Sequence, residues 1–230
     1  MHGPIGRLEG LAVLAAIGAA MLFGLSAHPL HPDESQWIAR SAPFEAFAAG
    51  RFSDPGWQDR RDRYLMAPVT YYAIGAGRRL GGWTPDRLNA PYRFELPFEA
   101  NFREGRVPSP GLLAWSRGGV ATCAALGIFL SFLVFLRAAG RPASYTWLAL
   151  ALVNPYLRAT LQRAMNEGVL LGWIGLSAWA GLRALEAGAP TNAQGDRRRA
   201  AAWLAAGAAA AGAAAQTKLS GAAAAAGLIA

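Results

Sequence analysis

The sequence has little cysteine and little lysine. Its 230 residues include one cysteine, Cys123, and one lysine, Lys218, so all the other cationic side chains at pH 7 are arginines. A single cysteine excludes an intrachain disulfide. Three chemical signatures are also missing: a glycine-rich phosphate loop, a Ser-His-Asp set and the paired spacing of zinc ligands. The chemistry of the chain must therefore lie in other residues.

Charge is absent from five long stretches of the chain. A helix that crosses a bilayer needs about 20 mostly apolar residues; three of the stretches nearly reach that length, and two need a polar flank. A soluble helical protein with buried helices is the alternative, but too many stretches are apolar on every face. The sequence therefore predicts an all-α polytopic membrane protein. The stretches are residues 10–27, 118–136, 142–157, 168–182 and 200–217.

The chain is basic, with a formal net charge of +8 at pH 7. A basic balance can indicate nucleic-acid binding, but here the arginines are spread over loops and helix ends. That distribution fits membrane topology and phosphate contacts better. We therefore expect a lipid bilayer and no nucleic acid among the partners. The abundance of arginine and alanine suggests a bacterial inner membrane.

Arginines between the apolar stretches predict the orientation of the chain. Arg137 and Arg141 flank one short connection, and residues 183–199 contain further arginines. Cytoplasmic loops are enriched in basic residues, so these connections and the N-terminus are expected in the cytoplasm. We expect residues 1–230 to be the N-terminal part of one transmembrane domain, with a sixth span beginning at residue 219. The five predicted spans are residues 8–27, 112–136, 143–162, 168–183 and 200–216, and Pro155 is expected to kink or break the third.

Residues 28–111 are then expected to form a long first loop on the outer side of the membrane. Within it, residues 33–49 predict a helix with Asp33 as its N-cap, which Pro43 would bend or split. Residues 81–110 combine turn residues with acids and aromatics, and they predict an irregular loop over the site.

Residues 64–80 predict a short amphipathic helix in the same outer loop. We interpret it as lying along the membrane surface, with Tyr71 and Tyr72 at the level of the lipid headgroups. The competing interpretation is a true span, which would invert the topology of everything after it.

Two adjacent acids, Asp33 and Glu34, follow the first predicted span. Carboxylates at the exit of a membrane helix can face a lipid-borne substrate from the water side. The alternative is an N-cap and a first-turn acid that favour the helix dipole. Other charged residues are predicted on the same outer side: Arg117, Arg158, Arg163, Glu167 and Lys218.

Four features, in chain order, resemble the GT-C superfamily of polyprenyl-phosphate-sugar glycosyltransferases. A first helix is followed by the acid pair within residues 31–34, His-Pro-Asp-Glu. Residues 67–72, Ala-Pro-Val-Thr-Tyr-Tyr, resemble the surface helix of the branch that includes protein mannosyltransferases and aminoarabinose transferases. Residues 154–167 and residues 217–221, Thr-Lys-Leu-Ser-Gly, resemble two helix ends of that branch.

The sequence departs from that branch before the surface helix. Met66 and Ala67 stand where a basic residue and a second proline are usual. The tetrad at residues 31–34 is also similar to the lipid-linked mannosyltransferases that elongate glycolipid precursors. The class of acceptor is therefore left open between protein, lipid and glycan.

The resemblance implies a GT-C-like transmembrane helix bundle that moves one sugar from a polyprenyl-phosphate donor to an acceptor hydroxyl. It implies Asp33 as the catalytic base, with Glu34 orienting the acceptor or Asp33. The leaving phosphate needs cations, for which Arg158, Arg163 and Lys218 are the candidates. The remaining expected substrate-binding residues are Arg117, Glu167, Tyr71 and Tyr72.

Each charged candidate also has a structural interpretation. Arginines at span ends often snorkel toward lipid headgroups. Glu167 pairs with Lys218 or Arg163 in the structural interpretation and contacts substrate in the functional one.

Three further alternatives stay open. His28 and His31 with Asp33 suggest metal ligands, although His-x-x-His spacing is poor support, and the oxygen-rich pair of Asp33 and Glu34 could equally hold Mg²⁺ or Mn²⁺. A transporter or flippase-like protein for lipid-linked sugars would have charges deep within its spans and paired broken helices. A non-catalytic membrane assembly subunit would not need the acid pair.

Overall fold

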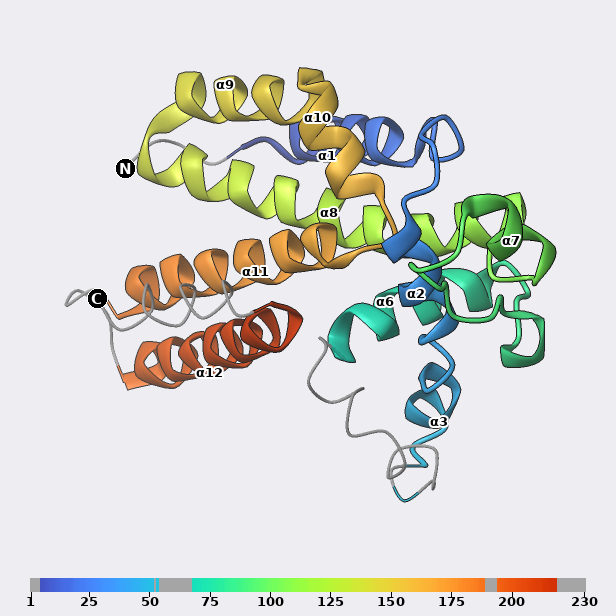
Figure 1. Ribbon diagram of the computed structural model, residues 1–230. Coiled ribbons are helices and arrows are strands. Elements are labelled where there is room, and N and C mark those ends of the chain that lie inside the picture. The colour runs from blue at the N-terminus through green and yellow to red at the C-terminus, as the bar shows by residue number, and fades with distance from the viewer. Residues whose placement is uncertain (1–4, 52, 54–67, 189–193, 219–230) are drawn as a thin grey trace.

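The computed structural model describes residues 5–51, 53, 68–188 and 194–218 (Figure 1). Among these residues all regular elements are helices and no strand occurs, as the apolar stretches predict. The helices that form the main bundle are α1 (Arg7–Leu22), α8 (Pro110–Ala138), α9 (Gly140–Val153), α10 (Pro155–Gln162), α11 (Asn166–Ala187) and α12 (Gln194–Thr217).

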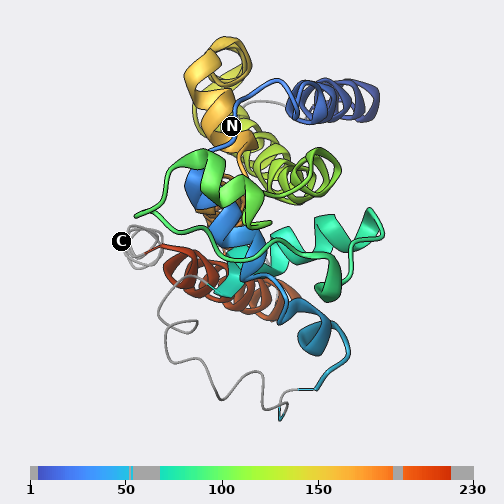
Figure 2. The same ribbon diagram turned by 45° about the vertical axis from the view of Figure 1, so that its right-hand side comes forward.

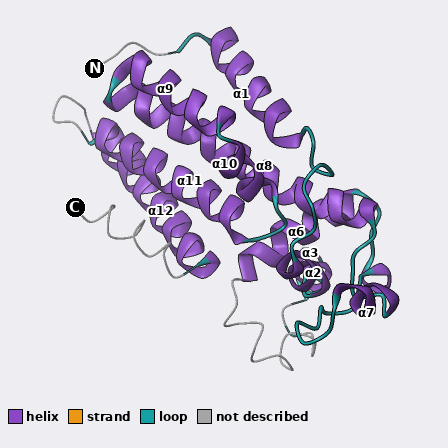
Figure 3. Cartoon of the chain, turned by 45° about the horizontal axis from the view of Figure 1, so that its top comes forward, coloured by secondary structure: helices purple, strands orange, loops and turns teal. Residues whose placement is uncertain are grey.

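The short helices gather at one end of this bundle, together with long loops (Figure 3). We call this end, formed by residues 23–51 and 68–109, the loop end. The opposite end carries the start of α1 and the connection from α8 to α9, and we call it the turn end. The short helices are α2 (Pro32–Ala39), α3 (Phe44–Ala48), α6 (Pro68–Leu80), the 3₁₀ helix η1 (Pro85–Arg87) and α7 (Phe98–Arg103).

Helix α8 is the centre of the molecule, because α1, α6, α9, α10 and α11 all contact it. One buried apolar cluster joins α1, α8 and α9 through residues such as Ile17 and Phe132. A second cluster joins α2, α6, α8 and α11 through Ile38, Ile74 and Val169. The second cluster lies at the loop end, so the short helices there are anchored on the bundle by apolar burial.

Glycines bring α8 and α11 into direct backbone contact. A Cβ added to Gly127 of α8 would lie 2.5 Å from the carbonyl oxygen of Leu171, and one added to Gly172 would lie 2.8 Å from that of Cys123. The crossing of α6 and α8 at Gly119 is equally close. Small residues of this kind let helix backbones approach, which is the usual way in which helices associate in lipid.

Two described helices, α8 and α11, are long and apolar enough to cross a bilayer. The sequence predicts five spans, and the other three do not form single described helices of that kind. Helix α1 has 16 residues, about 24 Å at the usual rise, because it ends at Leu22. Helix α12 has 24 residues, but alanine and glycine make most of its length only weakly apolar.

The outside of the bundle carries many large apolar side chains. Such a surface is costly in water and is expected where helices face lipid. With the two long apolar helices it supports association with a membrane. Examples are Leu11, Leu126, Phe135, Leu150 and Leu204.

Two predicted helices are split next to a proline, as the sequence indicates. Residues 33–49 form α2 and α3, with Pro43 as the N-cap of α3. Residues 143–162 form α9 and α10, which meet at Asn154. The side-chain oxygen of Asn154 accepts a hydrogen bond of 3.0 Å from the Leu157 amide, so it caps the second helix.

The prediction that Asp33 caps α2 is wrong, because the N-cap is His31. The His31 Nδ1 atom accepts a hydrogen bond of 3.2 Å from the Asp33 amide, and Glu34 Oε2 accepts one of 3.0 Å from the His31 amide. Pro32 occupies the first helical position, where its missing N–H costs nothing. The N-cap therefore lies two residues earlier than its acids suggest.

Helix α6 is the described part of the helix predicted for residues 64–80, and residues 64–67 lie outside the described residues. Its 13 residues span about 20 Å, which is short of the roughly 30 Å of a hydrocarbon core. It packs on α2, α3 and α8 at the loop end. Whether the helix predicted for residues 64–80 lies on the membrane or crosses it stays a prediction. The predicted sixth span, from residue 219, also lies outside the described residues.

Candidate functional site

The two adjacent acids of the sequence lie in opposite environments. Glu34 is completely buried and pairs with Arg117, which is also completely buried. Arg117 Nε lies 2.8 Å from Glu34 Oε1, and Nη2 lies 2.7 Å from Oε2. This two-pronged geometry is the strongest form of a carboxylate–guanidinium contact. We call this pair the Glu34–Arg117 lock.

Arg117 uses its remaining donors on the loop that follows α1. Its Nη1 donates to the carbonyl oxygens of Leu25, at 2.5 Å, and His28, at 3.0 Å. Its Nη2 donates to the carbonyl oxygen of Pro29 at 3.2 Å. All five N–H groups of the guanidinium therefore have protein partners. In this conformation Arg117 has no donor left for a substrate phosphate.

Glu34 is equally occupied. Besides two bonds from Arg117, its Oε2 accepts from the His31 amide at 3.0 Å and its Oε1 accepts from the Ala164 amide at 2.8 Å. Four donors thus fill the acceptor positions of the carboxylate. The lock ties α2 to α8 and to the junction of α10 and α11. Glu34 therefore holds its neighbour in place and presents no free oxygen to an acceptor.

Asp33 is the accessible acid of the pair, with 43% of its side chain exposed. Its Oδ2 lies 3.7 Å from His31 Nδ1. The same Nδ1 accepts the hydrogen bond from the Asp33 amide. The Asp33 carboxylate is therefore free to accept a proton or a hydrogen bond from a ligand.

Asp33 lines a cleft of about 300 Å³ between α2, α6 and the loop after α6. The α2 residues of this cleft recur at positions i, i+3, i+4 and i+7, which is one face of a helix. The helical spacing of these residues could have been recognised in the sequence. Nothing near Asp33 in the sequence points to Phe94, the cleft residue that comes from the loop. The other residues of the cleft are Gln36, Trp37, Arg40, Tyr71 and Phe94.

Tyr71 forms the floor of the cleft and is almost completely buried. Its ring lies 5.0 Å from the ring of Trp37, centroid to centroid. Burial raises the pKa of the Tyr71 hydroxyl, and the hydrogen bond and charge of Arg40 oppose this shift. The sequence predicted substrate contact for Tyr71, and the structure brings it beside Asp33. Tyr72 instead stacks on Phe47, with centroids 4.3 Å apart.

The loop after α6 is fastened onto α2 (Figure 2). Asn89 Nδ2 donates to the carbonyl oxygens of Ser35, at 3.0 Å, and Arg106, at 3.2 Å. The Ser35 hydroxyl donates to the same Arg106 carbonyl, and Gln36 Nε2 donates to the Tyr92 carbonyl. The irregular loop predicted over the site is therefore present, and side-chain amides hold it there.

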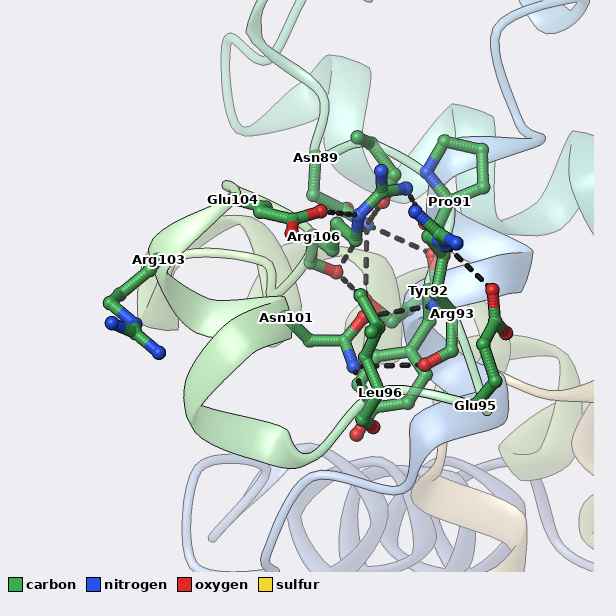
Figure 4. A network of polar contacts seen from close by, with 12 residues as sticks. Asn89, Pro91, Tyr92, Arg93, Glu95, Leu96, Asn101, Arg103, Glu104 and Arg106 are labelled. Atoms are coloured by element: carbon green, nitrogen blue, oxygen red, sulfur yellow. Dashed lines mark hydrogen bonds and ion pairs between the residues drawn. The ribbon is translucent and has the colours of Figure 1, made fainter.

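A second asparagine organises the same loop from within (Figure 4). The completely buried Asn101 accepts a hydrogen bond of 2.9 Å from the Arg93 amide and donates back to the Arg93 carbonyl at 2.9 Å. Its amide also donates to the carbonyl of Leu96 at 3.1 Å. These bonds fix the backbone on either side of Phe94, the loop residue that reaches the cleft.

The predicted phosphate ligands lie around the start of α11. Lys218 Nζ lies 3.1 Å from Glu167 Oε1, so these two residues form an ion pair, which the structural interpretation allowed. The other carboxylate oxygen of Glu167 is buried and has no hydrogen-bond partner among the described residues. The Nε atoms of Arg158 and Arg163 are likewise buried and unpartnered within that part of the chain. These groups retain hydrogen-bonding capacity.

One contact brings the acids and the cations to the same end of the bundle. Ala164, whose amide binds Glu34, follows Arg163 directly and stands three residues before Glu167. Glu167 in turn binds Lys218. The predicted site residues therefore converge at the loop end from α2, α8, the α10–α11 junction and the end of α12.

The described residues do not form a metal site. No group of three histidine, cysteine, aspartate or glutamate side chains in this part of the chain is placed to hold an ion. His28 Nε2 lies 2.8 Å from Gln162 Oε1 and so points toward Gln162, away from Asp33. Four protein donors occupy the Glu34 carboxylate, so the pair of Asp33 and Glu34 does not fit Mg²⁺ or Mn²⁺, and we derive no step through a metal.

The sequence analysis missed a second buried arginine, Arg78. Its guanidinium binds Glu45, with Nη2 and Oε2 2.7 Å apart, and also bonds to Ser41 and to the Trp83 carbonyl. This contact holds the turn between α2 and α3 on α6. Arg78 lies in the last turn of α6, where a cation favours the helix dipole. Its partner, Glu45, lies 33 residues earlier in the sequence, so no local pattern indicates the pair.

No protein-family model, curated protein or solved structure matches this chain. The functional interpretation therefore rests on the geometry at the loop end and on the short motifs that resemble GT-C glycosyltransferases.

Proposed function

We propose that the protein is an integral membrane glycosyltransferase of GT-C type. In this proposal it moves a sugar from a polyprenyl phosphate to an acceptor hydroxyl at the extracytoplasmic face, with Asp33 as the base. The observation that carries the proposal is the division between the two acids. Glu34 is buried and fully bonded, while Asp33 is exposed beside a cleft, with cations at the same end of the bundle.

Asp33 supplies the proton acceptor that such a transfer needs. The acceptor hydroxyl gives its proton to the Asp33 carboxylate while its oxygen bonds to the anomeric carbon of the sugar. The bond between that carbon and the phosphate oxygen breaks, and the polyprenyl phosphate leaves with both electrons. An accessible carboxylate suits this role, because it must meet the hydroxyl at hydrogen-bond distance.

Arg158 and Arg163 are the cations proposed for the leaving phosphate. Each has a buried Nε without a hydrogen-bond partner among the described residues, and arginine binds phosphate oxygens through paired N–H groups. Lys218 is held by Glu167 and adds positive charge to the same end. The Glu34–Arg117 lock sets the distance between Asp33 and this group, because it bonds to the residue after Arg163.

The membrane assignment of the proposal starts from α8 and α11, the two helices that are long and apolar enough to span. We propose further spans for α1, for α9 with α10, and for α12, whose exposed apolar side chains suit lipid. We propose that the turn end, near which basic residues lie, faces the cytoplasm and that the loop end faces outside. A bacterial inner membrane would present the lipid donor to this outer face.

Replacing Asp33 with asparagine tests the proposed reaction. The purified chain is reconstituted with radiolabelled polyprenyl-phosphate mannose or glucose and an extract of membrane acceptors, and loss of label from the lipid donor is measured. We expect Asp33→Asn to slow transfer by about 10² to 10⁴, the usual contribution of a positioned base. The matched control is Glu99→Gln, an exposed acid on α7.

The outcomes separate the candidate functions. No transfer by the wild-type chain from either donor, or an undiminished rate in Asp33→Asn, would refute the enzyme. Movement of a fluorescent lipid-linked sugar across vesicles without transfer would indicate the flippase-like alternative, which the break between α9 and α10 would then serve. Neither transfer nor translocation would leave the assembly subunit.

A further inference from the structure

We propose that the cleft beside Asp33 binds a sugar ring, so that the acceptor is a glycan or glycoside and not a peptide hydroxyl. The role of the bound sugar as acceptor rests on the proposed function, whereas the binding of a sugar in the cleft does not. The proposal follows from the combination of side chains around the cleft, which the resemblance to GT-C enzymes does not specify.

The walls of the cleft are aromatic. Trp37 is half-buried and fixed against Tyr71, with their ring centroids 5.0 Å apart. On the loop side, Phe94 is 61% exposed and lies edge-on to Tyr92 at 5.5 Å. A sugar ring presents one face of C–H groups, which packs on such aromatic faces. Phe94 therefore offers an exposed aromatic ring, held in place by the hydrogen bonds of the buried Asn101, opposite the Trp37 and Tyr71 rings of the cleft.

The polar groups of the cleft suit hydroxyls. The Asp33 carboxylate is an exposed acceptor, and Arg40 supplies cationic donors near the Tyr71 hydroxyl. Gln36 gives its Nε2 to the Tyr92 carbonyl, which leaves its Oε1 buried without a partner in the described part of the chain. Sugar hydroxyls can donate to both the Asp33 carboxylate and the Gln36 Oε1 atom.

The backbone around the cleft argues against a peptide. Extended peptides usually gain affinity from an unpaired strand edge, and amphipathic ones from a long apolar groove. Here four of the six lining residues lie on helices α2 and α6, whose backbone groups bond within their own helices, and a fifth, Arg40, is the C-cap of α2. A volume of about 300 Å³ is at the small end for ligand sites and suits one or two sugar rings.

Ligand-observed NMR tests this proposal on the full chain in lipid nanodiscs. Saturation transfer is measured to methyl α-mannoside, methyl β-glucoside and methyl β-galactoside at millimolar concentration, and to a serine- and threonine-containing peptide. We expect transfer to at least one glycoside and none to the peptide. Phe94→Ala, an exposed loop change, and Trp37→Leu should each weaken glycoside binding by about fivefold or more, given the usual worth of an aromatic contact.

Two controls make the result specific. Trp203→Leu changes a tryptophan near the turn end and should leave glycoside binding unchanged. Glu99→Gln, which changes an exposed acid on α7 outside the cleft, should likewise leave glycoside binding unchanged.

The result distinguishes failure of this proposal from failure of the proposed function. Glycoside binding that depends on Phe94 and Trp37 in a chain without transferase activity would support the cleft and refute the enzyme. Transfer that depends on Asp33 but is indifferent to Phe94→Ala and Trp37→Leu would refute the cleft and support the enzyme. Saturation transfer to the peptide alone, or to none of the probes, would also overturn the sugar site.

Discussion

The two ends of the bundle each carry a glutamate–arginine pair that ties the chain near α1 to a later helix, and the pairs lie in opposite environments. At the loop end, Glu34 and Arg117 are completely buried. At the turn end, Glu9 and Arg141 approach to 3.0 Å, but their side chains are 29% and 56% exposed. The chemistry of the contacts is the same, and only access to water differs.

That difference gives the pairs different roles. A buried pair has lost its hydration, so removal of one partner leaves a charge without compensation. An exposed pair can exchange its partner for water at little cost. The buried pair at the loop end therefore fixes the position of Glu34, and with it that of Asp33. The exposed pair at the turn end does not fix its residues in this way.

Arg117→Gln is expected to give the largest effect, because it leaves the Glu34 carboxylate buried without its cation. We expect a loss of about 3–5 kcal/mol in the free energy of unfolding, measured by denaturant titration in detergent micelles. The matched variant at the turn end, Arg141→Gln, should change stability little. Equal losses in the two variants would refute the contrast between the ends.

The glycine contact of α8 and α11, which runs between the two ends, should give the next largest effect. In Gly127→Ala the new methyl group would meet the Leu171 carbonyl oxygen at 2.5 Å, so we expect about 1–3 kcal/mol of destabilisation. Gly212→Ala is the control, since nothing lies within 4 Å of its added Cβ and a helix prefers alanine to glycine. A neutral Gly127→Ala would show that the helices can separate without cost.

An exposed pair at the loop end should give the smallest effect and separates exposure from location. The hydrogen bond from Arg93 lowers the pKa of Glu95, so this pair adds stability above the unfolded-state pKa and loses it as the pH falls through the folded-state pKa. We therefore expect the wild-type Tm to be slightly higher than the Tm of Glu95→Gln at pH 7. At acid pH the two Tm values should be equal. A Tm difference as large as the one between the wild type and Arg117→Gln would contradict this reasoning.

The sequence predicted the parts of the molecule that depend on local chemistry. Apolar stretches gave helices, and breaks were predicted near Pro43 and Pro155, because proline lacks an N–H and fixes its own backbone. The cap at His31 was missed, since histidine is an uncommon capping residue. The number of single long apolar helices was overestimated, because α1 stops early and α9 stops at Asn154.

The sequence named Asp33, Tyr71 and the cations near Glu167 as site residues from their position along the chain, and their roles stay predictions. The lock was not predicted, because Arg117 and Glu34 are 83 residues apart and each looks like an isolated charge in the sequence. The Phe94 wall of the cleft was likewise invisible, since it reaches α2 only through the hydrogen bonds of Asn89 and Asn101.

The sequence by itself determined that this chain is helical and that two acids follow its first helix. Only the tertiary structure decided which acid is available for chemistry. Successive residues of a helix point about 100° apart, so Asp33 and Glu34 face different surroundings as soon as α2 docks on α8. The neighbour that meets Arg117 becomes part of the framework, and the other is left facing the cleft.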